Sequence, residues 1–423
     1  MMRNRSLISL LLAFVLILPL IPAFSACDAG YDYVLNVYNW GEYISDGSED
    51  SLNVNELFEQ WYYQKTGYRL KVNYDTYDSN ESLRAKLEAG SASYDVIIPS
   101  DYMIEYFIEH DMLLELNLEN IPNYETHISS EFKNLFYDSD EQHTYTVPYT
   151  YGMVGIVYDS NIVADEDVGT WDLMWNEKYA KQILQFDNSR DAFGIAMYKN
   201  GFNGIDPDNP SDDLDVNTTN KQAWLHAYEE LAKQKPMLKR YVMDQVFNMM
   251  ESGDAAIAAY YAGDCITMME EAAEGVSLDF FYPKDDEGNV CTNIFMDAMC
   301  IPTCAKNKDI AEAYINFMLE TNVEINGEYY DIARANAEYI YYATPNQMVF
   351  NNPEYRESLG EDYWEILYPG KPFEVDSDET EQEEKQYDFV FDFSATYEKC
   401  AYANLDEETL AYISDLWLDL KLQ

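Results

Sequence analysis

The chain has 423 residues, of which 47% are hydrophobic and 25% are charged, as is typical of a globular protein; this composition excludes wholesale disorder. Its length allows about two to three domains. The 78 Asp and Glu residues outnumber the 26 Lys and Arg residues, which gives a formal net charge of −52 and excludes nucleic-acid binding, because such a surface repels phosphate backbones. We interpret most of these carboxylates as solvated groups that maintain solubility, so a role in cation binding must rest on particular residues.

The first 26 residues predict a secretory signal peptide. Arg3 and Arg5 provide a positive start, residues 7–20 form an apolar stretch, and small residues then precede Cys27. The sequence Phe24-Ser25-Ala26-Cys27 resembles the bacterial lipobox, in which the cysteine is lipidated and becomes the new N-terminus. We therefore expect an extracytoplasmic lipoprotein that is anchored to the cell membrane through Cys27 alone. The alternative is an uncleaved helical anchor, and two prolines near the end of the stretch argue against it.

The remaining cysteines and the histidines form no recognisable metal, redox or catalytic pattern. An odd number of cysteines in a chain this large does not indicate a disulfide framework, so we interpret most of them as core residues and leave one disulfide open. They are Cys265, Cys291, Cys300, Cys304 and Cys400. The four histidines are scattered, and the sequence contains no nucleophile elbow, phosphate-binding loop or dinucleotide fingerprint. It therefore predicts no catalytic residues, no metal and no cofactor.

The mature chain begins with alternating strands and helices. Helices are predicted at residues 55–66 and 79–88, and strands at residues 33–38, 69–74 and 95–99. The last of these strands is a short apolar run of the kind that is buried in a parallel sheet. This βαβαβ order predicts an open α/β sheet.

The same alternation resumes in the second half of the chain. Further strands are predicted at residues 182–186, 255–260, 278–282 and 294–301, and further helices at residues 190–200, 221–233, 308–320 and 410–422 and before Gly275. Residues 374–388 form an acidic stretch of low complexity, which we interpret as a solvated loop without function.

Candidate site residues follow from the fold class, because open α/β sheets bind ligands beyond the carboxyl ends of their strands. The residues that come after the predicted strands are mainly aromatic and acidic, and Arg190 is the only cation among them. The segments concerned are Trp40–Tyr43, Ser100–Tyr102, Asp187–Asp191, Tyr261–Asp264 and Phe295–Asp297.

This combination of residues suits a flexible alkyl chain that carries ammonium groups. Carboxylates replace the hydration of ammonium through charge-assisted hydrogen bonds, and aromatic faces contact methylenes and attract cations. Simpler interpretations also exist: Asp187 would cap the helix that follows it, Arg190 would pair with a neighbouring carboxylate, and any one of the tyrosines could belong to the core. Trp40, which follows a strand beside a glycine, is expected to form a binding wall.

At these residues the sequence resembles the spermidine/putrescine-binding proteins of ABC importers. Three motifs carry the resemblance: YNWGEY at residues 38–43, YDVIIPSDY at residues 94–102 and VPY at residues 147–149. The resemblance continues in order along the chain to Tyr342–Asn346. The resemblance implies a periplasmic-binding-protein fold of type II, in which two α/β lobes close on a ligand by a hinge motion. It also implies a monomeric binding protein without enzymatic activity, which delivers polyamines to a membrane permease.

The resemblance assigns roles to individual residues as well. Those that would line the pocket from the first lobe are Trp40, Tyr43, Ser100 and Tyr102. Those that would bind amines are Asp191 and Asp297, and those that would form further walls are Tyr261, Phe295 and Tyr342. Three departures leave the length and charge of the ligand open: two walls lack the tryptophan that is frequent in the family, Asn188 stands where some members have a second aspartate, and residues 45–52 look like an insertion. Putrescine, spermidine and spermine therefore cannot be ranked.

Each lobe is expected to be discontinuous in sequence. Residues 27–148 and 296–344 would form the first lobe, and residues 149–295 and 345–423 the second. Hinge crossings are expected near residues 147–151, 294–301 and 342–346. Two alternatives remain open: an extracellular hydrolase such as a glycosidase, which also uses paired carboxylates and aromatic walls, and a binding protein of the same fold for another solute, such as a different cationic amine or a peptide.

Overall fold

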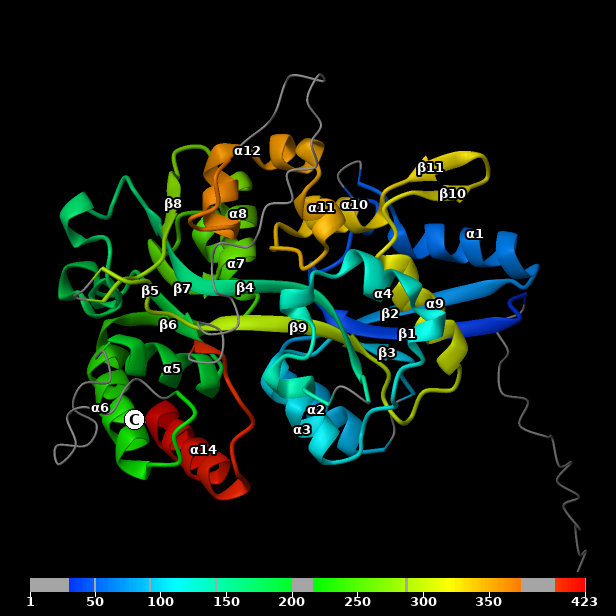
Figure 1. Ribbon diagram of the computed structural model, residues 1–423. Coiled ribbons are helices and arrows are strands. Elements are labelled where there is room, and N and C mark those ends of the chain that lie inside the picture. Colours follow the sequence, from blue (N-terminus) through cyan, green and yellow to red (C-terminus); the bar gives the residue numbers. More distant parts are fainter. Residues whose placement is uncertain are drawn as a thin grey trace, which may run out of the picture.

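The computed structural model describes residues 30–48, 51–90, 93–140, 143–199, 216–285, 288–373 and 400–422. The predicted signal peptide, Cys27 and the acidic stretch 374–388 lie outside these residues. Within them the chain forms two lobes that lie side by side and share one nine-stranded sheet (Figure 1). None of the helices described is both long enough and apolar enough to cross a membrane.

The strands of the described residues are β1 (Tyr33–Trp40), β2 (Leu70–Tyr77), β3 (Val96–Ile97), β4 (Thr146–Asp159), β5 (Ile183–Phe186), β6 (Leu238–Val242), β7 (Ile257–Tyr261), β8 (Leu278–Phe281), β9 (Ile294–Cys300), β10 (Val323–Ile325) and β11 (Glu328–Tyr330). The large sheet has the order β2-β1-β3-β9-β4-β7-β5-β6, with β8 paired to β4, and β10–β11 form a separate hairpin. Strands β1, β2 and β3 pair in parallel, as do β5, β6 and β7, whereas β4 and β9 run antiparallel to their neighbours.

Helices cover both faces of the sheet in each lobe (Figure 1). They are α1 (Val54–Thr66), α2 (Asn80–Glu88), α3 (Asp101–Glu109), α4 (Pro122–His127), α5 (Ser189–Lys199), α6 (Lys221–Gln234), α7 (Gln245–Glu251), α8 (Ala262–Glu270), α9 (Lys308–Met318), α10 (Ile332–Ile340), α11 (Gln347–Phe350), α12 (Pro353–Leu367) and α14 (Glu407–Leu422). The predicted helices and strands occur within the described residues, with ends that shift by a few residues.

Local capping chemistry fixes the first two helices. The side chain of Asn53 accepts a hydrogen bond from the backbone N–H of Glu56 at the start of α1, and Gly67 ends that helix with a left-handed φ of 76°. At the start of α2, Ser79 and Ser82 exchange side-chain and backbone hydrogen bonds in a capping box. These caps define where the two helices begin, and the parallel pairing of β1 with β2 and β3 brings the carboxyl ends of all three strands to one edge of the sheet.

The long strand β4 runs from one lobe into the other. Its first half (146–153) pairs with β9, and its second half (154–159) pairs with β7 and β8. A further segment runs beside this crossing, because the N–H of Tyr151 donates to the carbonyl of Ala343 over 3.0 Å. The three segments that the sequence analysis expects to cross between lobes therefore lie next to one another at the centre of the molecule.

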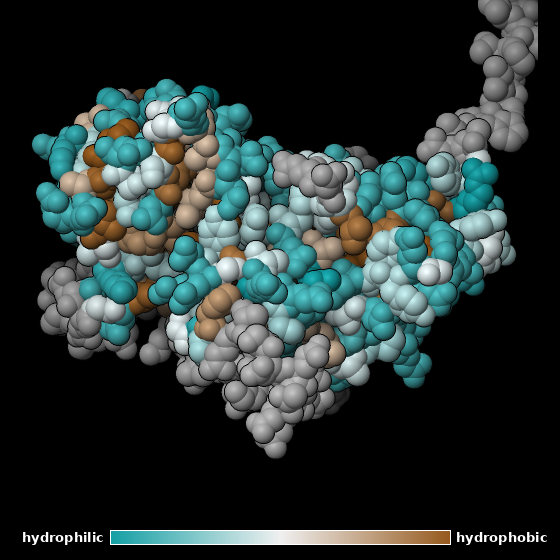
Figure 2. All heavy atoms as spheres, turned by 90° about the horizontal axis from the view of Figure 1, so that it is seen from above, coloured by the Kyte–Doolittle hydropathy of each residue, from teal (hydrophilic) through white to brown (hydrophobic). Residues whose placement is uncertain are grey.

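Two buried cores match the two lobes. The largest buried side chains of the first core are Phe58, Phe107, Phe132, Tyr314, Phe317, Tyr355 and Trp364, and those of the second are Tyr179, Phe186, Phe193 and Trp224. Burying this apolar area is the main favourable contribution to folding. On the face seen from above, hydrophilic side chains predominate and hydrophobic areas are confined to separate patches (Figure 2).

Residues 345–423, which were assigned to the second lobe as a whole, contribute to both cores. Helices α11 and α12 add Val349, Tyr355 and Trp364 to the first core, whereas Tyr402 and α14 belong to the second. The physical reason is the aromatic face of α12, which packs against the rings of the first core. The five described cysteines carry free thiols, and three of them, Cys265, Cys291 and Cys300, are buried.

Candidate ligand-binding site

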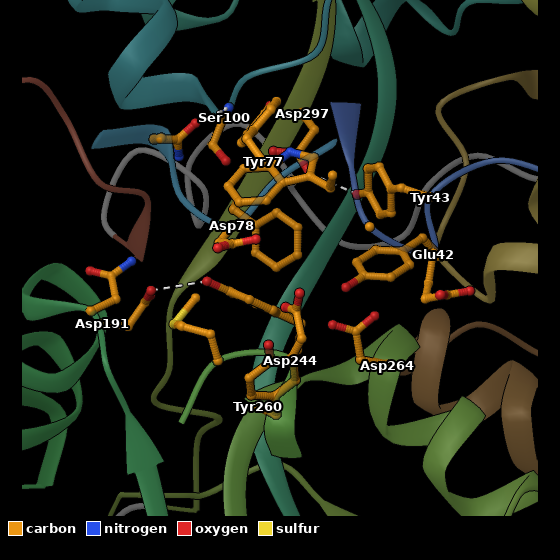
Figure 3. A pocket seen from close by; sticks show the side chains of 18 of the residues that line it. Glu42, Tyr43, Tyr77, Asp78, Ser100, Asp191, Asp244, Tyr260, Asp264 and Asp297 are labelled. Carbon is orange, nitrogen blue, oxygen red and sulfur yellow. Dashed lines mark hydrogen bonds between the residues drawn. The ribbon is translucent and has the colours of Figure 1, made fainter. Parts of the chain in front are cut away.

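A cavity of about 460 Å³ lies at the carboxyl ends of the strands, with walls from both lobes (Figure 3). All nine predicted site residues line it: Trp40, Tyr43, Ser100, Tyr102, Asp191, Tyr261, Phe295, Asp297 and Tyr342. They come from the end of β1, the start of α3, the first turn of α5, the end of β7, strand β9 and the segment after α10. The fold thus brings together residues that are up to 302 positions apart, and their role as ligand contacts remains a prediction.

Aromatic rings form a continuous wall along the cavity. The Tyr43 ring lies 4.8 Å from that of Tyr342, the Tyr342 ring 6.1 Å from that of Phe295, and the Phe295 ring 5.2 Å from that of Tyr261, in edge-on contacts. At the entrance side, Trp40 packs against Tyr77 at 4.6 Å. The buried indole Nε1 of Trp40 finds no hydrogen-bond partner among the described residues. Such a wall suits the methylene segments of a ligand.

Two glycines create the space that Tyr342 occupies. A Cβ atom on Gly263, at the start of α8, would lie 2.3 Å from Cδ2 of Tyr342. A Cβ on Gly152, in β4, would lie 2.8 Å from Cζ of Phe295 and 3.5 Å from Cδ1 of Tyr342. Since real Cβ atoms do not approach other atoms to 2.3 Å, only glycine at position 263 leaves this ring in place.

Asp297 lies at the centre of the cavity on β9 and is 4% exposed. Its Oδ2 accepts a hydrogen bond of 2.7 Å from the hydroxyl of Tyr43, which also bonds to Thr150. Its Oδ1 is buried and has no partner among the described side chains and backbone. Burial raises the pKa of Asp297 to about 6, although hydrogen bonds from Ser100 and Tyr43 oppose this shift. The free oxygen makes this carboxylate a ready acceptor for a cationic donor.

Asp191 provides a second carboxylate from the other lobe, in the first turn of α5. Its Oδ2 accepts a hydrogen bond of 2.9 Å from the hydroxyl of Tyr261 (Figure 3). Burial raises the pKa of Asp191 to about 7, and the hydrogen bond from Tyr261 limits the shift. Across the cavity, the hydroxyl of Tyr102 donates to Glu81 over 3.0 Å. Removing these carboxyls from water disfavours their charged form, and a bound cation would reverse that effect.

Asp264 is a third carboxylate at the site, which the sequence analysis placed in a candidate segment but did not select. Burial raises the pKa of Asp264 to about 8, and the nearby charges of Asp244, Glu42 and Asp297 add to the shift, while a hydrogen bond from Tyr342 opposes it. In the close-up view Asp264, Glu42 and Asp244 point toward the same part of the cavity (Figure 3). This acidic end faces the same space as Asp297.

Several other lining residues were also missed. Glu42 sits between two residues that were selected, and Asp78 follows β2, whose predicted end was three residues too early. Asp244 follows β6, a strand that was not predicted at all. The available signal was the position of an acid shortly after a strand. For Asp78 and Asp244 that signal requires a strand end that was not known, whereas Glu42 lay in a candidate segment and was passed over in favour of its aromatic neighbours.

The site carries only negative formal charge. Its lining residues include no Lys, Arg or His among the described residues, but they include nine acids: Glu42, Asp78, Asp101, Asp191, Asp244, Glu251, Asp264, Glu271 and Asp297. No group of His, Cys, Asp and Glu in the described part of the chain has the arrangement needed to hold a metal ion. A lining of this charge favours a cation at the site over an anion.

Arg190 does not line the cavity, and within the described residues it forms no ion pair with a carboxylate. It interacts with the neighbouring carboxylate of Asp191 only through its charge, which opposes the raised pKa of Asp191. It is buried, and its guanidinium donates to the side chain of Asn217 and to backbone carbonyls that include the carbonyl of Ala403. Its plane also lies 4.5 Å from the centre of the Tyr402 ring. Carbonyl and amide oxygens satisfy its donors at this position.

Asp187 is not the cap of α5, contrary to the simpler interpretation. The side chain of the next residue, Asn188, accepts the N–H of Arg190 over 2.8 Å and so performs this role. Asp187 instead forms an ion pair with Lys421 at the end of α14. It does not line the cavity.

Comparison with known proteins agrees with this geometry. The profile of the family described as bacterial extracellular solute-binding protein matches residues 58–333. The spermidine/putrescine-binding periplasmic protein of Salmonella typhimurium is 30% identical over 323 residues, which are 76% of this chain and 80% of that protein. A structure from Listeria monocytogenes, assigned to a spermidine/putrescine ABC transporter, aligns with a TM-score of 0.68 and 29% identity over 92% of this chain and 99% of that one.

A spermidine/putrescine substrate-binding protein of Streptococcus pneumoniae aligns with a TM-score of 0.62 and 27% identity over the same shares of both chains. These alignments confirm the predicted two-lobe α/β binding-protein fold. The chain therefore belongs to the family of bacterial extracellular solute-binding proteins.

Proposed function

We propose that the cavity binds a linear polyamine, such as spermidine or putrescine, for import by an ABC transporter. The observation that carries this proposal is the cavity itself, whose lining combines buried carboxylates with a continuous aromatic wall and includes no Lys, Arg or His among the described residues. Each ammonium group of a polyamine would replace its hydration with a carboxylate, while its methylenes would contact the rings. The names of the aligned relatives, which refer to spermidine and putrescine, support the same ligand class.

The buried carboxylates explain why an uncharged solute would bind poorly. Asp191 and Asp297 are each 4% exposed, and burial raises the pKa of both, so a bound cation would stabilise their charged forms. A sugar offers hydroxyl groups, which are weaker donors to a carboxylate than an ammonium group. Membership of a solute-binding family also identifies the chain as a binding component rather than an enzyme, which removes the glycosidase alternative.

Binding would close the lobes about β4 and β9, and the closed form would dock on the membrane permease. In this proposal the first lobe comprises residues 27–148 and 296–344, and the second lobe comprises residues 149–295 and 345–423. We further propose that the monomeric protein is held at the outer face of the membrane by a lipid on Cys27. This anchor would keep the loaded protein close to its transporter.

Isothermal titration calorimetry with putrescine, spermidine and spermine tests the ligand class directly. At least one of the three should bind, and a thermal scan should show stabilisation of about 2.7 kcal/mol at 100 times the dissociation constant. Maltotriose and a tripeptide without basic side chains serve as controls. Stabilisation by either control, together with no response to any polyamine, would show that the site binds another class of solute.

A further inference from the structure

A short segment of the second lobe, Ala401–Asn404, contacts the first lobe beside the cavity. It lies just before α14 and faces α3 (Figure 1). Its position is set by contacts on two sides, one within its own lobe and one across the cavity. Neither set of contacts involves the carboxylates proposed to bind the ligand.

The segment is fixed to the second lobe by several contacts. The side chain of Asn217 donates to the carbonyl of Ala401 over 2.9 Å and accepts the N–H of Ala403 over 2.8 Å. Tyr402 is 4% exposed, and its ring lies against the guanidinium of Arg190. A Cβ on Gly194 of α5 would lie 2.1 Å from the hydroxyl of Tyr402, so glycine is required for this ring position. The segment therefore moves with the second lobe.

On its other side, the segment bonds to α3 of the first lobe. The N–H of Asn404 donates to Oε2 of Glu105 over 2.6 Å, and its side-chain amide donates to Oε2 of Glu109 over 2.7 Å. The ring of Tyr402 also meets that of Tyr102, in the first turn of α3, at 6.3 Å. Hydrogen bonds to carboxylates are among the stronger ones that proteins form, and both of these bonds join one lobe to the other.

We propose that Ala401–Asn404 is a clasp that holds the two lobes in the closed arrangement and thereby sets the affinity of the cavity through hydrogen bonds of Asn404, which does not line it. This proposal rests on the proposed function for its ligand, because polyamine affinity is what the clasp would set. A ligand can leave only after the lobes separate, so each interlobe bond lowers the rate of ligand release. Asn404 and Glu109 are positioning residues in this scheme, since they act through lobe closure and do not touch the ligand.

The test is Asn404→Asp, which replaces the amide donor with a carboxylate that faces Glu105 and Glu109. We expect the dissociation constant for spermidine to rise by about tenfold, mainly through faster dissociation measured by stopped-flow fluorescence, with an association rate that changes less than twofold. Asn161→Asp is the matched control, because it adds the same charge to an exposed loop of the same lobe. It should leave both rates unchanged.

Two further variants keep the test independent of folding defects. Glu109→Ala removes one interlobe bond at an exposed position of α3 and should speed dissociation by about threefold. Adding Glu109→Lys to Asn404→Asp places opposite charges together and should restore most of the lost affinity. Unchanged dissociation in Asn404→Asp, or a double variant as weak as the single one, would overturn the clasp.

Scattering without ligand separates this proposal from the proposed function. The clasp implies that part of the free population is already closed before ligand binds, and that ligand binding completes the closure. In small-angle X-ray scattering of the free proteins, Asn404→Asp should therefore increase the radius of gyration relative to both wild type and Asn161→Asp. If wild type binds no polyamine but this increase occurs, the proposed function fails and the clasp stands. If polyamine binds normally and neither the radius nor the dissociation rate changes, the clasp fails and the proposed function stands.

Discussion

Asp297→Asn should weaken polyamine binding and at the same time stabilise the empty protein. In the folded chain, burial raises the pKa of Asp297 from an ordinary 3.8 to about 6. Keeping this group charged above pH 6 therefore costs about 3 kcal/mol relative to the unfolded chain. Asparagine removes that cost but accepts a weaker hydrogen bond from Tyr43, so we expect a net stabilisation of about 1–3 kcal/mol at pH 7.

The sign of the pH dependence follows from the raised pKa. Between pH 4 and pH 6 the unfolded chain has lost the proton that the folded chain retains, so wild-type stability falls as the pH rises through this window. The asparagine does not titrate. The difference in unfolding free energy between variant and wild type should therefore be small at pH 4 and reach its full size above pH 6.

Binding should respond in the opposite direction to stability. The neutral amide leaves an ammonium group without its carboxylate, and hydrogen bonds to charged groups contribute about 1.5–3 kcal/mol, so affinity for spermidine should fall by about ten- to more than a hundredfold. Calorimetric scans from pH 4 to pH 8 and titrations at pH 7.5 measure both effects. Asp415→Asn, on the exposed face of α14, is the control and should change neither. A variant that unfolds more easily above pH 6, or that binds spermidine like wild type, would refute this reasoning.

Three further perturbations address the rest of the site and the anchor. Lowering the pH from 8.5 to 6 should weaken spermidine binding by about tenfold or more, because burial raises the pKa values of Asp191 and Asp264 to about 7 and about 8, and the ammonium groups of the ligand bind the charged forms of these carboxylates. Titrations in buffers of different ionisation enthalpy should show proton release, and an affinity that is independent of pH would contradict this. Gly263→Ala should displace the ring of Tyr342 and reduce affinity at least tenfold in calorimetric titration, whereas wild-type affinity would show that the ring is not needed in its present position. Cys27→Ser should release the protein from membranes on cell fractionation with its polyamine affinity intact, and a processed variant that stays on the membrane would exclude the lipid anchor.

Much of the fold could be predicted because its elements have strong local signals. Helix α1 has a capping asparagine, an apolar face and a terminal glycine, and β3 is a short apolar run before a proline. Strand β4 could not be predicted as one element, since it is buried on both faces along its whole length and shows no alternation of polar and apolar residues. The division of the C-terminal segment between two cores depends on tertiary packing, which sequence periodicity does not contain.

The residues of the candidate site could likewise be predicted only in part. Asp191, Asp297 and the aromatic residues could be named because they follow predicted strands or match a family motif. Asp244 could not, because its strand β6 was not recognised: the sequence LKRYV is short and carries two basic residues in its middle. Tyr402 had no signal in the sequence either: it reaches the cavity from a segment between a low-complexity stretch and a helix, and only the contact with Arg190 and the space at Gly194 place it there.

The paired strands β4 and β9 have a mechanical consequence for transport. Because backbone hydrogen bonds join these strands where the chain passes between the lobes, opening must twist a stiff ribbon rather than straighten a slack linker. Each lobe then rotates as a rigid body about the ribbon formed by β4 and β9. A permease that contacts both lobes far from this ribbon would need only a modest force there. The resulting torque about the ribbon would open the cleft and free the solute.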